Sequence, residues 1–356
     1  MRLLGAFALL AFGLGSTAEA ADYASFNQAY AAKIVAPAFA ALAARTAEFS
    51  GTAAASCAAP GTRGVERMVA GFNAVADAWM SAQQFRLGPL SQGQRAERFA
   101  YWPEKRNVVQ KQLFELLAAN DPMKLTPERF AQASVAVQGL TALERLLFGD
   151  DARAALLGGD QHMIRCTIIA AIAANLDAVA QEAMNGWAEV LADPQQAPAP
   201  FAANPVEATT QFYSNLLTEL QIVGDLKVAA PLGASLGKAR PNLAEQWRAG
   251  RSLRNVVLNL EAAKRAIFSE GGFEVLFAGP KFADLRSRLA AAFDGAIEAA
   301  RDVPQPLDSS VAVAEDRKKV ELLFIRINQL CDIARQEVPP AIGITLGFNE
   351  LDGDGS

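Results

Sequence analysis

Residues 138–148 read Gln-Gly-Leu-Thr-Ala-Leu-Glu-Arg-Leu-Leu-Phe and continue a helix-like run that begins near Thr126. Threonine is a favourable N-cap and Pro127 suits the first helical position, so the pattern predicts a single helix from Thr126 through Phe148. At 100° per residue, four polar side chains form one stripe along this helix: Ser134, Gln138, Thr141 and Arg145. Glu144 falls outside the stripe, in a sector with four apolar neighbours: Ala133, Val137, Leu140 and Phe148.

Glu144 is therefore the residue of this stretch that needs an explanation. A carboxylate among apolar side chains must be compensated by a cation, a metal ion or hydrogen-bond donors, or else it takes up a proton. Two interpretations stay open. Glu144 either forms an ion pair with an arginine of a neighbouring helix, or it is the polar centre of a buried site.

Helical periodicity dominates the rest of the chain and predicts an all-α fold. Tyrosine and tryptophan number only four each, alanine is abundant, and no alternating pattern long enough for a strand occurs. The segment Asp-Pro-Gln-Gln-Ala-Pro-Ala-Pro, which starts at Asp193, is the clearest linker. We therefore expect two helical-bundle domains packed against each other, at 21–192 and 206–346, with a Pro-rich linker at 193–205 and a polar tail at 347–356.

Glycine and proline predict loops at 51–64 and 227–242, and apolar spacing predicts a helix at 243–268. Within this helix, Arg248 and the uncharged Ser252 and Asn255 lie on one polar face. The face is either a solvated basic surface or a hydrogen-bonding line toward another helix or domain. In the second case, an arginine from this segment would compensate Glu144 across the domain interface.

Composition excludes some classes of protein. Hydrophobic residues make up 51% and charged residues 20% of the 356 residues, so the chain can bury a large core and is not globally disordered. The formal net charge is -5 and there is no basic stripe. Nucleic acid is therefore not an expected partner.

Residues 1–20 have the pattern of a secretory signal peptide. A charged start precedes an apolar run at 3–14, and Ala-Glu-Ala at 18–20 fits a small-x-small cleavage site. The run is too short to span a bilayer comfortably, and no cysteine follows the cleavage site to carry a lipid. We predict a periplasmic mature protein without a transmembrane anchor.

The three cysteines predict one disulfide and one buried thiol. Export makes an oxidising compartment the expected one. Cys57 lies in the predicted loop at 51–64 and Cys166 lies near a helix start, so we expect these two to pair. Cys331 has apolar neighbours and is expected to stay a buried thiol. The spacing excludes a zinc-finger or thiolate metal site.

Other landmarks have ordinary structural explanations when each is taken alone. Trp79 lies on the apolar face of a helix predicted at 65–85, and Arg86 lies one heptad step further on. Gly88-Pro89 stops this helix, and Trp102-Pro103 is typical of an extended corner.

Taken together, these motifs resemble those of the imelysin-like family, a bacterial envelope family first described as metallopeptidases. Gly-Leu-Thr-Ala-Leu-Glu at 139–144 resembles the family's Gly-x-His-x-x-Glu signature, except that Thr141 stands where the family has histidine. Four further landmarks follow the family's order: Arg86-x-Gly88-Pro89, Trp102-Pro103, Arg251-Ser252 and the terminal Gly347-Phe348-Asn349-x-x-Asp352-Gly353-Asp354.

The resemblance implies an all-helical protein with two bundle-like domains, a site near their interface and a link to iron uptake. It implies that Glu144 forms the core of this site, with walls that include the following residues: Thr141, Arg86, Trp79, Arg248, Arg251, Ser252 and Asn255. The ligand it suggests is a divalent metal or iron ion held through Glu144, or a small anion. An envelope protein is the other candidate partner.

We therefore predict a non-catalytic periplasmic binding protein. A metallopeptidase is the first alternative, but it needs several metal ligands and an activated water, and Thr141 removes the signature imidazole. A purely structural or interaction protein is the second alternative. The two non-catalytic possibilities differ in whether Glu144 faces an open cavity or is sealed in an ion pair.

Overall fold

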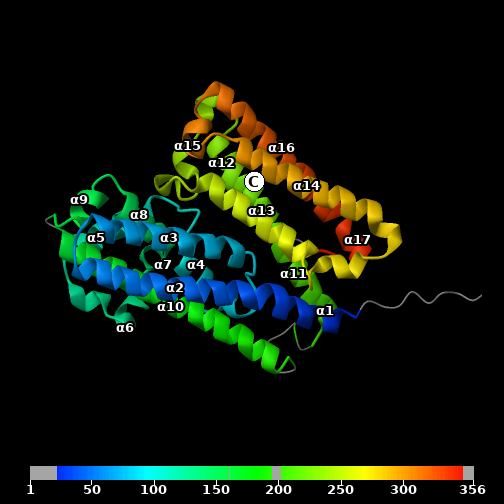
Figure 1. Cartoon of the computed structure of the whole chain (residues 1–356), viewed down its shortest axis with the longest axis horizontal. Helices are drawn as coiled ribbons and strands as arrows, with labels where there is room; N and C mark the ends of the chain where they lie inside the picture. Colours follow the sequence, from blue (N-terminus) through cyan, green and yellow to red (C-terminus); the bar gives the residue numbers. More distant parts are fainter. Residues whose placement is uncertain (1–21, 160, 195–200, 202, 348–356) are drawn as a thin grey trace, which may run out of the picture.

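The computed structural model describes residues 22–159, 161–194, 201 and 203–347. All regular secondary structure in this part of the chain is helical, as the sequence predicts (Figure 1). The predicted signal peptide lies outside the described residues, as do most of the predicted linker and most of the C-terminal tail.

The first group of helices surrounds two long antiparallel neighbours, α2 and α10, with α3 packed on α2 (Figure 1). Its elements are α1 (Tyr23–Tyr30), the π-helical turn η1 (Ala31–Val35), α2 (Ala36–Ala58), α3 (Thr62–Ala82), η2 (Gly88–Gln94), α4 (Arg95–Phe99), α5 (Val108–Ala119), η3 (Pro122–Leu125), α6 (Pro127–Phe130), α7 (Val135–Gln138), α8 (Leu140–Phe148), α9 (Ala152–Leu156) and α10 (His162–Ala192).

The second group is built on α13, α14 and α16, which pack side by side (Figure 1). Its elements are α11 (Pro205–Gln221), the π-helical η4 (Ile222–Ala229), α12 (Ala230–Leu232), η5 (Leu236–Lys238), η6 (Pro241–Leu243), η7 (Trp247–Ala249), α13 (Ser252–Phe268), η8 (Phe273–Phe277), η9 (Pro280–Phe282), α14 (Ala283–Asp302), α15 (Leu307–Ser310), α16 (Ala314–Gln336) and α17 (Val338–Ile342).

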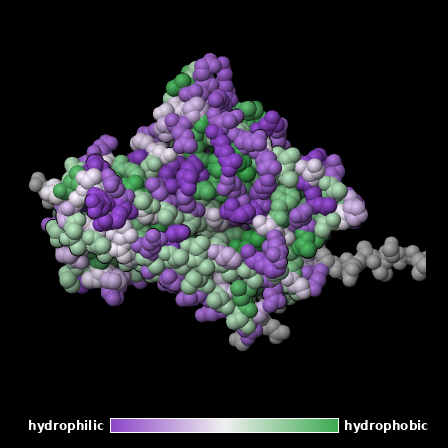
Figure 2. Space-filling model, in the orientation of Figure 1, coloured by the Kyte–Doolittle hydropathy of each residue, from purple (hydrophilic) through white to green (hydrophobic). Residues whose placement is uncertain are grey.

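One continuous apolar core runs through both groups. Aromatic rings connect them: the Tyr30 ring lies 4.7 Å from Phe212 and 4.9 Å from Phe273, and Trp187 stacks on Phe212 at 6.2 Å. Helix α13 also packs against α3, and α1 against α11. Weakly hydrophobic residues spread over the N-terminal helices, in keeping with their alanine-rich sequence, and hydrophilic side chains cover much of the C-terminal group (Figure 2).

Helix α10 has the length and hydropathy of a membrane span. Its apolar residues pack against α2, and large side chains such as Trp187 are fully buried. A central helix of a bundle has the same composition as a membrane span, because apolar side chains surround it on every side.

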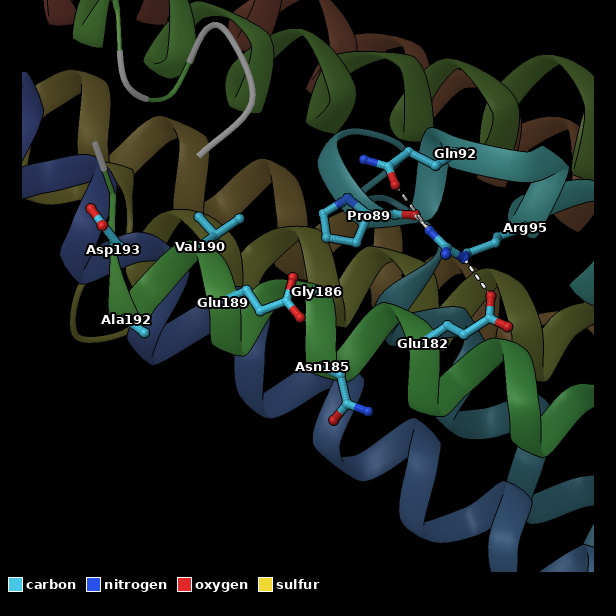
Figure 3. A pocket seen from close by; sticks show the side chains of 10 residues that line it. All are labelled: Pro89, Gln92, Arg95, Glu182, Asn185, Gly186, Glu189, Val190, Ala192 and Asp193. Atoms are coloured by element: carbon cyan, nitrogen blue, oxygen red, sulfur yellow. Dashed lines mark hydrogen bonds and ion pairs between the residues drawn. The ribbon is translucent and has the colours of Figure 1, made fainter. Parts of the chain in front are cut away.

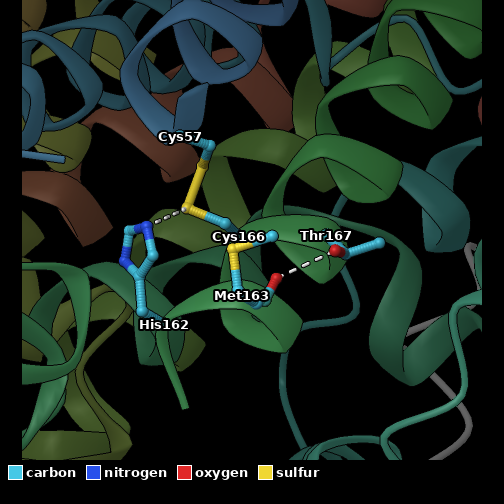
Figure 4. Close-up of a disulfide and its surroundings, with 5 residues drawn as sticks. All are labelled: Cys57, His162, Met163, Cys166 and Thr167. Atoms are coloured by element: carbon cyan, nitrogen blue, oxygen red, sulfur yellow. Dashed lines mark hydrogen bonds between the residues drawn. A yellow bond between two sulfur atoms is a disulfide. The ribbon is translucent and has the colours of Figure 1, made fainter. Parts of the chain in front are cut away.

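The predicted disulfide is present and joins the last turn of α2 to the first turn of α10. Cys57 and Cys166 are 109 residues apart, and the Nε2 atom of His162 lies 4.0 Å from the Cys166 sulfur (Figure 4). The predicted loop at 51–64 is wrong, since α2 continues to Ala58. The alanine-rich composition of this stretch favours helix, and Gly61 precedes the next helix.

The single helix predicted from Thr126 through Phe148 is wrong. The chain forms three short helices, α6, α7 and α8, and Gly139 has an extended conformation between the last two. A Cβ atom at Gly139 would overlap the backbone oxygens of Phe99 and Arg98. The break therefore depends on a close approach to α4 that only glycine permits, and the polar stripe does not exist as one face.

The predicted loop at 227–242 and helix at 243–268 are also displaced. Lys227 lies in η4, which continues α11, and α13 begins only at Ser252. Gln246 and Gly250 have left-handed backbone conformations that keep η7 apart from α13. Arg248 therefore lies on a short separate turn rather than on the helix that carries Asn255.

Candidate functional site

Glu144 lies on the buried side of α8, where it faces η7 of the second helix group. Only 3% of the residue is exposed, and its Oε1 atom accepts a hydrogen bond of 3.2 Å from the backbone N–H of Ala249. Burial raises the pKa of the Glu144 carboxyl to about 7, although the positive charge of Arg248 and the nearby backbone N–H groups act in the opposite direction. Glu144 is thus a buried carboxyl that titrates near neutral pH.

A cavity of about 540 Å³ opens beside Glu144. Its walls come from four parts of the chain, which are α8, the segment at 102–107, the end of η4 with α12, and the segment at 242–248. The principal lining residues are Thr141, Glu144, Arg145, Trp102, Glu104, Arg106, Asn107, Leu226, Ala230, Leu243, Gln246, Trp247 and Arg248. The cavity therefore lies between the two helix groups.

Arg248 is a half-buried cation in the cavity wall. Its guanidinium carbon lies 4.3 Å from the centre of the Trp247 ring, a cation–π contact. Among the described residues, no hydrogen bond or ion pair holds this guanidinium. Burial lowers the pKa of Arg248, and the positive charge of Arg145 lowers it further.

Arg145, on the wall opposite Arg248, forms hydrogen bonds with three other side chains. Its Nη2 atom donates to Glu104 Oε2 at 2.6 Å and to Asn107 Oδ1 at 3.2 Å, and Nη1 donates to Gln110 at 2.8 Å. The other oxygen of Glu104 accepts from the backbone N–H of Val109 at 2.8 Å. The Arg145–Glu104 pair therefore holds the 102–107 segment against α8.

A second polar cluster, which we call the sealed network, lies at the same interface. It is centred on Lys227, whose Nζ atom donates to Glu245 Oε2 and Asn259 Oδ1, each at 2.8 Å. The Lys227 ammonium also lies 5.7 Å from the centre of the Trp102 ring. Lys227 is 1% and Glu245 4% exposed, so this ion pair is inside the protein.

The predicted residues Arg251, Ser252 and Asn255 all belong to the sealed network. Ser252 donates to the backbone oxygen of Glu245 at 2.7 Å, and Asn255 donates to Glu245 Oε2 at 2.8 Å. Arg251 binds Asn73 at 3.0 Å and forms an ion pair with Asp77 of α3. Arg251 thus connects the two helix groups, whereas Ser252 and Asn255 bind within the second group. None of the three lines the cavity beside Glu144.

Trp79 and Arg86 lie on the other side of Trp102, where they line a narrow crevice with Lys227. Trp79 is 1% exposed and stacks on Phe99 with the ring centres 4.4 Å apart. Arg86 is exposed at the surface. Of the predicted site residues, the fold thus brings Glu144, Thr141 and Arg248 to one cavity.

Two further cavities are larger than the one beside Glu144. One of about 740 Å³ adjoins the first and shares Arg145, Trp247 and Arg248 with it. Another of about 680 Å³ lies along α10 and η2, where Arg95 donates to Glu182 at 2.8 Å and to the backbone oxygen of Pro89 at 2.6 Å (Figure 3). This last cavity contains none of the predicted site residues.

The side chains around Glu144 do not fit a catalytic metal. In the described part of the chain, no group of three histidine, cysteine, aspartate or glutamate side chains is placed to hold a metal ion. Glu104 already accepts from Arg145 and from the Val109 N–H, and Thr141 offers only a hydroxyl. A zinc hydrolase needs about three protein ligands and an open position, which these residues do not supply.

A family model matches most of the chain. This model describes imelysin, a peptidase family, and it matches residues 35–334. The chain belongs to the imelysin family. The matched range includes Glu144 and the cavity around it, and it confirms the resemblance seen in the sequence motifs.

Two solved structures share the fold of this imelysin family member. An imelysin-like protein from Psychrobacter arcticum is 20% identical with a TM-score of 0.76, and the match covers 91% of this chain and 98% of that one. A protein described as an iron-regulated protein A precursor from Parabacteroides distasonis is 14% identical with a TM-score of 0.71, covering 88% and 94%. No protein with curated functional information matches the chain.

Sequence reasoning missed Lys227, Glu245 and Trp247. Lys227 and Glu245 lie 18 residues apart, in segments predicted as a loop and as a helix, and nothing in either pattern indicates that they pair. Trp247 directly precedes Arg248, and an aromatic residue beside an arginine was the available signal.

Proposed function

We propose that this imelysin family member is a non-catalytic binding protein of the bacterial envelope, with its ligand in the cavity beside Glu144. The observation that carries the proposal is a buried, titratable carboxyl that shares an open cavity with Arg248, an arginine that forms no hydrogen bond or ion pair with the described part of the chain. Structural ion pairs are normally closed, whereas binding sites keep such groups available.

Two observations support export to the periplasm. Residues 1–20 have the composition of a signal peptide, and the Cys57–Cys166 disulfide is typical of proteins that mature in an oxidising compartment. The Parabacteroides neighbour is itself described as a precursor.

The metallopeptidase alternative has less support, because the cavity lacks the ligand set for a catalytic metal. The alternative of a purely structural protein does not explain why Arg248 and Glu144 share a cavity of about 540 Å³. A small ligand accounts for both features.

A link to iron uptake rests on the family resemblance and on the Parabacteroides neighbour, which is described as iron-regulated. The donor set around Glu144 supports a role in this process without direct coordination of iron. Measurement of transcript and protein levels in cells grown with and without an iron chelator tests the link, and unchanged levels would remove it.

Ligand occupancy is the direct test. Protein isolated from the periplasm is denatured, and the released small molecules are identified by mass spectrometry. We expect a stoichiometric molecule from the wild type and none from Thr141→Trp, because the indole would occupy the part of the cavity next to Glu144. Thr345→Trp is the control, since this exposed threonine lies outside the cavity.

The same preparations are then tested for peptide cleavage with and without added zinc. Zinc-dependent cleavage that Glu144→Gln abolishes would support the metallopeptidase instead. A wild type that releases nothing and is indistinguishable from Thr141→Trp would support the structural alternative.

A further inference from the structure

In the wall of the cavity beside Glu144, the half-buried guanidinium of Arg248 has no hydrogen-bond or ion-pair partner among the described residues. Arg145 is held by Glu104, Asn107 and Gln110, but among the described residues the guanidinium of Arg248 has only its stacking contact with Trp247. A guanidinium has five N–H donors, and none of those of Arg248 meets a protein acceptor among the described residues. An anion in the cavity would supply those acceptors.

The groups around this cation make an anion more suitable than a second cation. The ring of Trp247 already stacks on Arg248, and that of Trp102 already faces the Lys227 ammonium at 5.7 Å. Arg106 adds a further positive charge at the cavity wall. A cationic ligand would meet like charges on these walls, which is unfavourable at short range.

The remaining wall residues favour an organic molecule over an inorganic ion. The walls include five apolar or aromatic residues: Trp102, Pro103, Leu226, Leu243 and Trp247. A space of about 540 Å³ is in the range of small-molecule pockets, and a bare ion would leave most of it to water. Apolar contact with these walls would add to the attraction of the charge.

We propose that the cavity binds an organic anion whose acidic group is held by the Arg248 guanidinium and accepts a hydrogen bond from the protonated carboxyl of Glu144. The inference rests on the proposed function and names its ligand class. Protonation matters because an ionised Glu144 would repel the anion and compete for Arg248, whereas the neutral carboxyl donates a hydrogen bond.

The carboxylates that face the cavity region from other packed elements are largely paired, which leaves Glu144 as the buried carboxyl without a cation in the described part of this region. Glu104 is paired with Arg145 on α8, Glu245 with Lys227 of η4, and Asp77 of α3 with Arg251. Two charged side chains that are unpaired within the described part of the chain, Asp150 and Arg106, also lie near the cavity, on the surface of the protein. Anion binding should therefore weaken as the pH rises past the pKa of Glu144, which is about 7.

Calorimetric titration with three probes tests the ligand class. Benzoate carries a carboxylate on an aromatic ring, benzamide is its neutral analogue of similar shape, and inorganic phosphate is an anion without apolar surface. At pH 6 we expect benzoate to bind at least tenfold more tightly than either of the others. Equal binding of benzamide would overturn the need for charge, and equal binding of phosphate would overturn the organic ligand. No binding of benzoate would overturn the inference as a whole.

Two variants test the assigned residues. Arg248→Gln should weaken benzoate binding at least tenfold at pH 6, while Arg129→Gln, an exposed arginine on α6, should leave it unchanged. In the wild type, affinity should fall about tenfold per pH unit above about 7. Glu144→Gln keeps a hydrogen-bond donor but cannot ionise, so its affinity should not change between pH 6 and pH 9.

A wild type whose benzoate affinity does not depend on pH, or an Arg248→Gln protein that binds normally, would refute the assignment. Melting temperatures of all variants separate loss of binding from loss of folding. If benzamide binds as well as benzoate and Thr141→Trp blocks both, the anion inference fails while the binding function stands. If the periplasmic protein carries no ligand at all, the proposed function itself fails.

Discussion

The interface between the helix groups contains two polar clusters that differ in how many hydrogen bonds and ion pairs their side chains form. In the sealed network, Lys227 and Glu245 form an ion pair of 2.8 Å, and Asn255 and Asn259 supply further hydrogen bonds. In the cavity, Glu144 accepts a backbone hydrogen bond from Ala249, and Arg248 donates to no acceptor among the described residues. Lys227, Glu245 and Glu144 are similarly buried, but only Lys227 and Glu245 are paired with an opposite charge.

This difference distinguishes polar groups that hold the structure together from polar groups that are free to bind a ligand. A buried ion pair whose remaining donors and acceptors are satisfied holds two surfaces together, and removing one partner leaves a buried charge. A buried carboxyl without a full set of partners instead shifts its pKa, which is what burial does to Glu144. The burial of a polar residue is therefore a weaker indicator of function than the state of its hydrogen bonds.

The largest expected effect comes from breaking the sealed network. Lys227→Met should lower the free energy of unfolding by about 3–5 kcal/mol, because Glu245 would keep a buried charge without its cation. Chemical denaturation at pH 7 measures the change, with the exposed Lys238→Met as control. Adding Glu245→Gln to Lys227→Met should recover much of the loss. A single variant as stable as the wild type would show that the network is not structural.

Replacing the cavity residue Glu144 should instead raise the free energy of unfolding. The native state binds a proton on Glu144 more tightly than the unfolded chain does, so wild-type stability should fall as the pH rises from about 4.5 to about 7. Glu144→Gln removes this penalty and should raise the free energy of unfolding by about 3 kcal/mol at pH 8, with little change at pH 4.

Denaturation curves at both pH values measure this difference, and the exposed Glu128→Gln serves as control. A Glu144→Gln protein that is less stable than the wild type at pH 8 would mean that the carboxylate is fully compensated. Glu144 would then belong with the structural ion pairs, and the contrast between the two clusters would disappear.

The smallest expected effect comes from the edge of the sealed network, where an exposed and a buried arginine share the partner Asp77. Arg254 also pairs with Asp77, but its side chain is 55% exposed, against 4% for Arg251. Arg254→Gln should cost less than about 1 kcal/mol and less still at high salt. Arg251→Gln should cost more, since its partners Asp77, Asn73 and Gln246 lose a buried donor. Equal costs measured by denaturation would show that burial of the cation does not matter here.

Some parts of the fold were predictable and others were not. The strongly periodic helix α3 was predicted because the apolar spacing of its residues over several turns does not depend on the tertiary arrangement. The break at Gly139 was missed because it depends on the approach of α4, and the start of α13 was missed because η7 is set apart by the backbone at Gln246 and Gly250.

The candidate site divides in the same way. Glu144 was identified because a carboxylate in an apolar sector is visible in the sequence, and Arg248 because it lies in a segment of unusual polar composition. Lys227 was not, since its burial depends on Glu245, Asn259 and Met80, which come from separate segments. No local sequence pattern indicates which polar residues from separate segments will come into contact in the folded protein.

The sequence by itself determined that this protein is all-helical, that it belongs with the imelysin-like proteins, that Cys57 pairs with Cys166 and that Glu144 needs compensation. These follow from periodicity, composition and motif order, which are properties of the chain. Only the tertiary structure decided that Arg251 and Asn255 are sealed with Lys227 while Arg248 faces a cavity with Glu144. Partner choice, burial and pKa depend on segments that meet only after folding.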